Sequence, residues 1–185
     1  MSLYKIIIIS GPIAVGKSSV VSELIAEHGF KKISSGSYLA DVAKKNGIEP
    51  SRPNLTKIGD KLDETTDFKW VITEILTPLL EKTSGQNFWV FDSVRKVRQV
   101  EHFKTEFGSN VFHVHFTASE KELKLRYEKR QAEGNTRDDN ILYEDAILTD
   151  NEIESRSLNQ HADKIINITS MKSSTAAQEI LKDLV

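Results

Sequence analysis

The chain alternates between two patterns of hydrophobic residues, one typical of buried strands and one typical of amphipathic helices. Segments rich in apolar and β-branched residues predict strands at residues 6–9, 87–92, 111–117 and 163–168, and residues 30–33 predict a further short strand. Apolar residues at helical spacing predict helices between them, at residues 17–28, 38–45, 54–62, 68–80, 97–107, 119–130, a segment ending near 158, and 173–185. Strands that alternate with helices indicate the α/β class: a five-stranded parallel sheet with helices on both faces, in three αβα layers.

Polar and helix-breaking residues predict where several of these helices begin and end. Residues 34–37, Ser-Ser-Gly-Ser, indicate a turn that offers an N-cap to the second helix, and Asn54 is a candidate cap for the third. Pro78 predicts a kink in the fourth. Residues 131–140 are polar and lack an apolar period, which predicts a mobile loop.

Composition limits the classes of protein to consider. A length of 185 residues fits one domain, residues 1–185, with a substantial core. The net charge of −2 gives no field for nucleic acid or an anionic membrane, and no apolar run is long enough for a signal peptide or a membrane span, so we expect neither partner. The lack of cysteine excludes disulfides, thiolate zinc sites and thiol catalysis, and it fits a cytoplasmic protein.

The junction between the first strand and the first helix carries the clearest chemical signal. Residues 11–18, Gly-Pro-Ile-Ala-Val-Gly-Lys-Ser, match the phosphate-binding pattern G-x-x-x-x-G-K-[ST]. Gly11 and Gly16 permit backbone angles that turn N–H groups toward a phosphate, and Lys17 can reach the β- and γ-phosphates. The Ser18 hydroxyl can join the shell of a Mg²⁺ ion, near the positive end of the following helix. The loop predicts a P-loop NTPase fold that binds a nucleoside triphosphate; the alternative is an ordinary Gly-rich turn.

Two further segments should meet this loop, because the carboxyl ends of parallel strands form one ligand-binding edge. They are the turn at residues 34–37 and the segment 92–95. Asp92 can hold a Mg²⁺-bound water or orient an attacking group, and its alternative role is to cap the next helix. Arg95 can grip a phosphate with two hydrogen bonds, and its alternative is a surface ion pair.

Basic residues near the predicted loop at 131–140 are candidates for neutralising a transferring phosphate. Arg126 and Arg130 are four residues apart and share one helix face, while Arg137 lies in the loop. For each, the alternative is a solvated surface charge. His113 and His115 share a face of the fourth strand; a metal pair would lack a third ligand nearby, so buried, hydrogen-bonded histidines are the favoured interpretation.

The sequence resembles the nucleoside-monophosphate kinases, adenylate kinase in particular. Residues 33–36 are similar to the I-S-T-G of their acceptor site, residues 92–95 with Gln99 to their D-G-x-P-R…Q, and residues 137–139 to the R-x-D-D of their lid. A closer resemblance is to the archaeal adenylate-kinase-related proteins, sometimes labelled dephospho-CoA-kinase-like. Residues 91–103 match their D-G-[IV]-R…E-V-E-x-F without a gap, and residues 162–167 match A-D-x-[IV]-[IV]-x-N apart from its spacing.

This resemblance implies an ATP- and Mg²⁺-dependent kinase, with an acceptor-binding helical insertion at residues 34–66 and a lid at residues 131–140. The implied site has four groups of residues, some with two roles. They are catalytic Lys17, Asp92, Arg95, Arg130 and Arg137; ATP-binding Gly11, Ala14, Val15, Gly16, Lys17, Ser18, Ser19, Arg126 and Arg130; acceptor-binding Ser35, Gly36, Arg52, Arg95 and Gln99; and metal-binding Ser18 and Asp92.

The chain also departs from the pattern of these kinases. Ser37 and Ala40 replace the Asp and Arg that follow their I-S-x-G turn, and Thr149 replaces an arginine after the lid, for which Arg52 or Arg156 can substitute. The first hypothesis is transfer of the γ-phosphoryl group of ATP to a small nucleotide-like acceptor, such as a nucleoside monophosphate. The alternatives are a dephospho-CoA kinase, whose acceptor is a ribose hydroxyl, and a nucleotide-binding regulatory protein with little transfer activity.

Overall fold

A computed structural model describes residues 4–134 and 141–184 of the chain. Its centre is one five-stranded sheet in the order β2-β3-β1-β4-β5, with every neighbouring pair parallel. The strands are β1 (Lys5–Ser10), β2 (Lys31–Lys32), β3 (Phe88–Phe91), β4 (Val111–Thr117) and β5 (Lys164–Asn167). All five predicted strands are therefore confirmed, although β2 comprises only residues 31–32 of the predicted 30–33.

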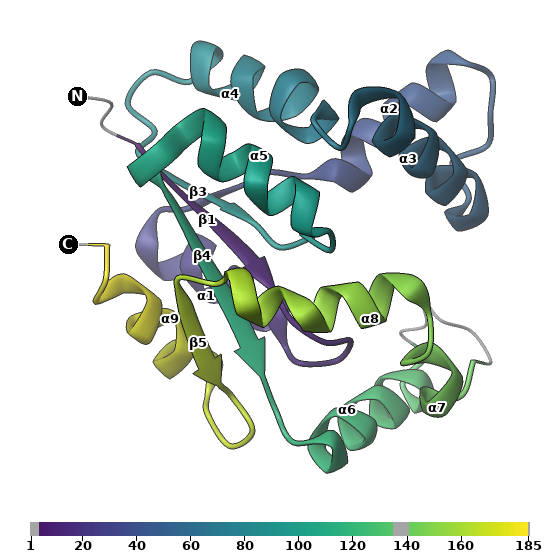
Figure 1. The fold of residues 1–185 in the computed structure, drawn as a ribbon, viewed down its shortest axis with the longest axis vertical. Coiled ribbons are helices and arrows are strands. Elements are labelled where there is room, and N and C mark those ends of the chain that lie inside the picture. Colours follow the sequence, from purple (N-terminus) through teal and green to yellow (C-terminus); the bar gives the residue numbers. More distant parts are fainter. Residues whose placement is uncertain (1–3, 135–140, 185) are drawn as a thin grey trace.

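Alternation along the buried strands divides the core into two halves. In β1, Ile7 and Ile9 face helices α1 (Lys17–His28) and α9 (Ser173–Leu181), whereas Ile6 and Ile8 face α5 (Val97–Phe107) and the wide-turned helix η1 (Val71–Leu76). Figure 1 shows these helices on opposite faces of the sheet. The three-layer αβα arrangement is confirmed, and it explains why β1 is apolar on both faces.

The segment between β2 and β3 is helical, with boundaries that differ from prediction. It contains α2 (Ser35–Lys45), α3 (Arg52–Thr66), η1 and α4 (Thr77–Lys82). Ser34 caps α2 as expected, but α3 begins at Arg52 with Ser51 as its N-cap, because the proline that follows is suited to a first helical turn. Asn54 instead donates its side-chain amide to Glu49 O at 3.0 Å. The predicted helix 68–80 is divided where the Thr77 N–H bonds Ile72 O, five residues back.

The segment between β4 and β5 is also more divided than its pattern suggests. It contains α6 (Glu120–Ala132), α7 (Tyr143–Ala146), α8 (Asp150–Ser157) and the 3₁₀ turn η3 (Leu158–His161). The extended backbone at Thr149 separates α7 from α8, where one continuous helix was expected. Helix α6 extends to residue 132 and so includes the first residues of the predicted loop; residues 135–140 of that loop lie outside the described part.

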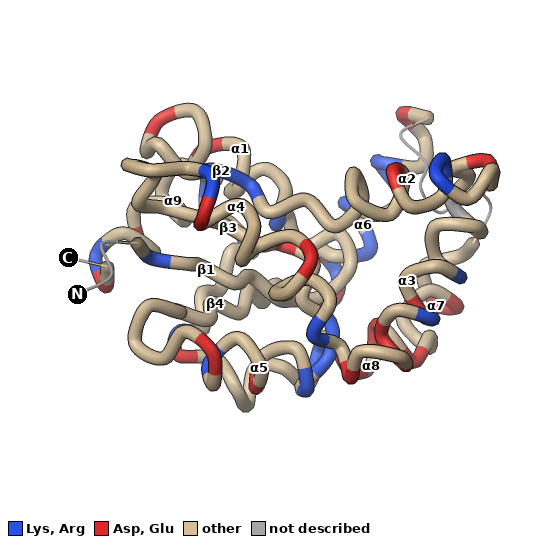
Figure 2. The backbone as a smooth tube through the Cα atoms, turned by 90° about the horizontal axis from the view of Figure 1, so that it is seen from above, with Lys and Arg blue, Asp and Glu red and all other residues tan. Residues whose placement is uncertain are grey.

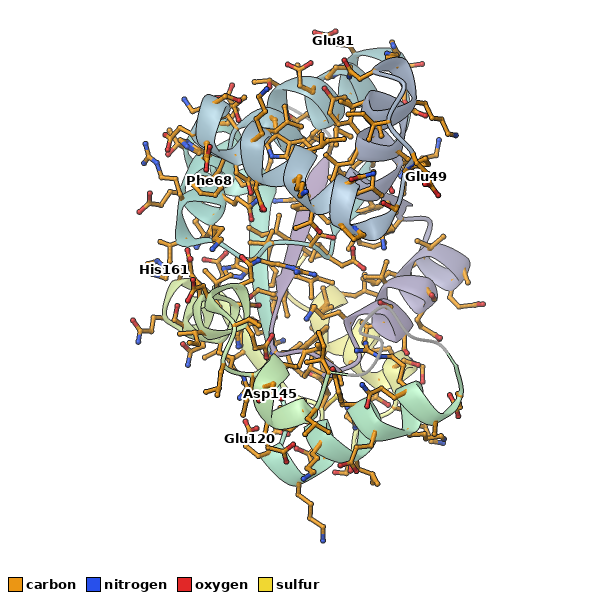
Figure 3. The ribbon with its side chains drawn as sticks, turned by 90° about the vertical axis from the view of Figure 1, so that its right-hand side faces the viewer. Glu49, Phe68, Glu81, Glu120, Asp145 and His161 are labelled. Atoms are coloured by element: carbon orange, nitrogen blue, oxygen red, sulfur yellow. The ribbon has the colours of Figure 1, made fainter. Side chains whose placement is uncertain are left out.

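Two groups of helices extend beyond the carboxyl ends of the strands. Helices α2 and α3 lie on one side, and α6 and α7 lie on the other, with the end of β1 between them (Figures 1 and 3). Basic and acidic residues are interspersed over both groups (Figure 2). Within residues 4–134 and 141–184, every helix falls short of the length and apolar character that crossing a bilayer requires.

Candidate functional site

The phosphate-binding loop connects β1 to α1 in a conformation that requires glycine at Gly11. Its φ is +137°, and an added Cβ would lie 2.5 Å from Phe116 O, a main-chain atom of β4. Gly16, with φ +107°, precedes the first residue of α1. The loop therefore lies directly against the neighbouring strand, and its last residues lead into the positive end of a three-turn helix.

Lys17 lies folded over this loop. Its Nζ donates to Gly11 O at 2.6 Å and to Pro12 O at 3.0 Å. Burial, and after it the charge of Arg95, lowers the pKa of Lys17 to about 8. The ammonium is thus held over the loop interior, where an incoming phosphate would exchange these carbonyl contacts for ionic ones.

Four charged side chains from three other parts of the chain lie close enough to Lys17 to act on its charge. Arg95, Glu152, Asp92 and Arg130, in decreasing order of effect, act on its pKa. The two arginines lower the pKa and the two carboxylates raise it. Arg130 also lies over the Tyr127 ring, 5.4 Å from its centre. Arg95, Asp92 and Arg130 were candidates from the sequence, and the structure brings them to one centre.

Helix α8 supports the loop from the side of the sheet that carries α5. The Ile13 N–H donates to both carboxylate oxygens of Glu152, at 2.9 and 3.1 Å, and the Ser155 hydroxyl donates to Gly11 O at 3.1 Å. Both side chains are buried. Arg156 donates to Glu152 at 2.9 Å and also bonds Glu120 and the Tyr143 hydroxyl. Arg156 therefore belongs to an ion-pair network. Its guanidinium, which the sequence suggested as a substitute for the missing lid arginine, is already bonded to these side chains.

Asp92 follows β3 and is paired with a cation that the sequence patterns did not indicate. Its Oδ2 lies 2.8 Å from the Lys32 Nζ at the end of β2, and its Oδ1 accepts a long bond of 3.4 Å from the Ser93 hydroxyl. The Asp92 side chain is only 7% exposed. Nearby, the Arg95 N–H donates to the Gln99 side-chain oxygen at 3.0 Å, so Gln99 holds the backbone from which Arg95 extends.

A pocket of about 270 Å³ adjoins the loop at the start of α1. It is lined by Val15, Gly16, Ser19, Val20, Arg126, Ile168, Met171, Ser173 and Ala176. The Arg126 guanidinium donates to Val15 O at 2.8 Å and to the carbonyls of Ile168 and Thr169 at 3.1 and 2.9 Å. Arg126 therefore joins the phosphate loop to the β5–α9 connection, and the pocket between them lies near the lower size limit of small-molecule sites.

The remaining candidates are placed as follows. Ala14 lies within the loop, and Ser18 and Ser19 are exposed in the first turn of α1. Ser35 and Gly36 form the first turn of α2, with no atom within 4 Å of a Cβ built on Gly36. The backbone of Arg52 begins α3, while its side chain and the whole of Arg137 lie outside what the structure describes.

His113 and His115 are buried with Ser10 in a hydrogen-bonded group beneath the loop. The Ser10 hydroxyl lies 2.7 Å from His113 Nε2 and 2.8 Å from His115 Nδ1. Since His113 Nδ1 faces the His161 carbonyl at 3.1 Å, it carries the proton, and its Nε2 accepts from Ser10. Burial lowers the pKa of each histidine to about 4. The prediction of buried, hydrogen-bonded histidines is confirmed, and the described residues contain no cluster of three metal-ligating side chains.

The ligand set fits a magnesium ion that enters with nucleotide phosphates. Ser18 presents an exposed hydroxyl at the start of α1, and Asp92 provides a carboxylate near Lys17. Mg²⁺ is commonly held by one or two protein groups together with substrate phosphates and waters, so a larger protein cluster is not required.

The sheet and the loop together define a P-loop nucleotide-binding protein. Residues 7–160 match a family model described as an AAA domain, and the chain belongs to that family. A UPF0200 protein of Methanosarcina mazei is 28% identical over 140 residues, which cover 76% of this chain and 72% of that protein. A cytidylate kinase of Saccharolobus islandicus is 37% identical over 75 residues, which cover 37% of this chain and 39% of the relative.

The fold is also similar to that of solved kinases. Shikimate kinase from Acinetobacter baumannii, in complex with shikimate, matches with a TM-score of 0.55 at 16% identity, over 99% of this chain and 94% of that one. Together, the family model, the relatives and the fold confirm the nucleoside-monophosphate-kinase-like P-loop family that the sequence indicated.

Proposed function

We propose that the protein is a cytoplasmic, ATP- and Mg²⁺-dependent kinase that transfers the γ-phosphoryl group of ATP to a small nucleotide-like acceptor. The observation that carries this proposal is the phosphate loop with Lys17 Nζ held 2.6 Å from Gly11 O, and with Arg95, Asp92 and Arg130 close enough to act on its charge. Phosphoryl transfer depends mainly on positioning and on neutralising charge, and these groups supply both. The cytidylate kinase relative supports a nucleoside monophosphate as the acceptor.

Each part of the site has a proposed role. The pocket beside Arg126 receives the base of ATP, because it opens next to the loop that receives the phosphates. Ser18 and Asp92 hold the magnesium ion, which neutralises charge on the β- and γ-phosphates when bound. Arg95 and Gln99 serve the acceptor side with Ser35, Gly36 and Arg52, and residues 131–140, with Arg137, close over the transferring phosphate.

The test is ADP formation from Mg²⁺ and ATP across a panel of acceptors, with ATP binding measured beside it. The panel contains the four ribonucleoside monophosphates, dephospho-CoA, shikimate and gluconate. We expect a monophosphate to stimulate ADP formation, and Lys17→Ala to abolish it while circular dichroism shows an intact fold. Stimulation only by dephospho-CoA would favour a ribose hydroxyl as the acceptor, and a failure to bind ATP would reject the proposal.

One observation favours the regulatory alternative. Arg156 is held by Glu152 and Glu120, and Ala40 and Thr149 stand where related kinases have arginines. A site short of arginines can bind ATP and still transfer its phosphate slowly. Tight ATP binding with no ADP formation from any acceptor in the panel would support a regulatory protein over a kinase.

A further inference from the structure

Lys32 and Asp92 form an ion pair at the edge of the candidate site. Lys32 ends β2, where it pairs with Val90 of β3, and Val90 belongs to the half of the core that contains α1. From this position its Nζ reaches Asp92 Oδ2 at 2.8 Å. The Asp92 side chain is 7% exposed and the Lys32 side chain 39% exposed, so a buried carboxylate is paired with a partly exposed cation.

The same carboxylate is already shared with a second cation. Asp92 is close enough to Lys17 to raise its pKa, although burial and Arg95 outweigh this effect. One oxygen of Asp92 is taken by Lys32, and the other has only the long contact to Ser93. A magnesium ion near Ser18 would therefore approach a carboxylate that already has an ammonium group bonded to one of its oxygens.

We propose that Lys32 is a resident counter-ion that competes with the divalent metal for Asp92. This inference rests on the proposed function, because it assumes that the metal arrives with ATP. A metal ion on Oδ1 and the Lys32 ammonium on Oδ2 would share one carboxylate and repel each other, so metal binding weakens the ion pair between Lys32 and Asp92. Lys32 thus weakens metal binding, and it keeps the buried Asp92 carboxylate paired whenever the metal is absent.

Lys31 provides a matched control. It is the neighbouring residue of β2, it is exposed, and it has the same charge. Since successive side chains of a strand point to opposite faces, Lys31 lies on the other face of the sheet, level with Trp89. Lys31→Met and Lys32→Met therefore remove the same charge from the same strand, but only Lys32→Met removes the ion-pair partner of Asp92.

The experiment measures Mn²⁺ binding by electron paramagnetic resonance to each protein saturated with a non-hydrolysable ATP analogue. We expect Lys32→Met to tighten Mn²⁺ binding about 10-fold, because a neighbouring charge changes the affinity of a carboxylate for a cation by at least about that factor. Lys31→Met should bind Mn²⁺ within about twofold of the wild type. Lys32→Gln gives the same comparison if the methionine variant fails to fold, and Lys32→Arg should behave like the wild type.

Unchanged Mn²⁺ binding in the neutral Lys32 variants would overturn the inference. Weaker Mn²⁺ binding would also overturn it, because it would show that Lys32 orients Asp92 for the metal. Failure of the proposed function has a different signature. In that case the wild-type protein would not bind the ATP analogue, or Mn²⁺ would not bind to the wild-type complex.

Discussion

In the phosphate loop, backbone conformation requires glycine at Gly11, and phosphate binding requires a positive charge at Lys17. The motif specifies the residue types and, through them, the turn itself, so Gly11, Gly16 and Lys17 could be assigned roles before the fold was known. The partners of the loop could not be assigned in this way. Glu152 bonds Ile13 across 139 positions of sequence, and Lys32 bonds Asp92 across 60. Such contacts depend on where α8 and β2 lie, which local patterns do not determine.

The pKa of Lys17 makes nucleotide binding depend on pH. Burial first, and Arg95 second, place this pKa near 8 in the free protein, and bound phosphates would raise it. Below pH 8 the lysine is charged in both states, so affinity for ATP should be nearly constant. Above pH 8 the free lysine loses its proton and must regain it on binding, so affinity should fall by up to about tenfold per pH unit.

Calorimetry at pH 9, in two buffers of different ionisation enthalpy, measures this proton uptake directly. The wild-type protein should take up a fraction of a proton when it binds ATP. Lys17→Met should take up none and should bind ATP more weakly at neutral pH. Binding without proton uptake by the wild-type protein would contradict the assignment of the low pKa to a lysine that contacts phosphate.

The surroundings of Gly11 and Gly59 predict opposite effects on stability for substitution by alanine. In Gly11→Ala the new Cβ would overlap Phe116 O in a backbone conformation that side chains disfavour, so we expect a loss of at least about 2 kcal/mol in unfolding free energy. A Cβ added at Gly59, in α3, would lie 3.6 Å from Leu39 Cδ1, an ordinary contact distance, so Gly59→Ala should gain about 0.5–1 kcal/mol in unfolding free energy. Urea unfolding measures both, and a harmless Gly11→Ala would show that the loop backbone can move away from β4.

At the scale of elements, periodicity identified the strands and helices better than their ends. The apolar run of β1 marked the central strand, because burial on both faces leaves a strand without polar positions. The edge strand β2 consists of two exposed lysines and was marked only by the apolar residues that flank it. The sequence pattern predicts one helix that ends near residue 158, but the extended backbone at Thr149 divides this segment into two helices. Likewise, the wide turns of Val71–Leu76 have no sequence signal besides the proline that follows them.

Helix α8 should stabilise the phosphate loop through Glu152. Removing this buried carboxylate in Glu152→Ala leaves the Ile13 N–H without its acceptor and removes one partner of Arg156. The expected cost is about 1–3 kcal/mol in unfolding free energy, the range for a buried group deprived of its hydrogen bond. Urea unfolding should show a smaller loss for Glu152→Gln, whose amide oxygen still accepts from Ile13.

Asn151→Ala is the control for this prediction. Asn151 is exposed on the same helix, so its substitution should change the unfolding free energy by less than about 0.5 kcal/mol. If Glu152→Ala costs no more than this control, the contact between α8 and the loop does not stabilise the fold, and another segment must position the loop.

For the whole molecule, the topology explains why distant motifs share one site. The order β2-β3-β1-β4-β5 places the phosphate loop between the ends of β3 and β4, so Asp92 and Arg95 lie on one side of it and α6, with Arg130, on the other. The meeting of the phosphate loop with segment 92–95 could be predicted from the sequence, because parallel strands end at one edge of the sheet. The order of the strands could not. The carbonyl contacts of Arg126 and the ion pairs of Arg156 could not, because both depend on packing between α6, α8 and the β5–α9 connection.

Arg95 follows β3 and is close enough to Lys17 to lower its pKa, and under the proposed function its substitution should separate acceptor binding from ATP binding. Its backbone is fixed by Gln99, and its charge lowers the pKa of Lys17. With Ala40 in place of a second arginine, Arg95 should carry most of the contact with an acceptor phosphate. A charged hydrogen bond contributes about 1.5–3 kcal/mol, so Arg95→Ala should raise the acceptor KM by about 10- to 150-fold.

The same variant should change ATP binding in a different manner. At pH 7, ATP affinity should remain nearly unchanged, because Lys17 is protonated with or without Arg95. The decline of affinity at alkaline pH should begin at a higher pH, because the cation that lowers the pKa of Lys17 is gone. Arg95→Lys should keep the original pH dependence but restore the acceptor KM only in part, since an ammonium cannot form the two-pronged contact. If ATP affinity at pH 7 falls while the acceptor KM stays constant, Arg95 serves the donor, and an acceptor phosphate at this position is excluded.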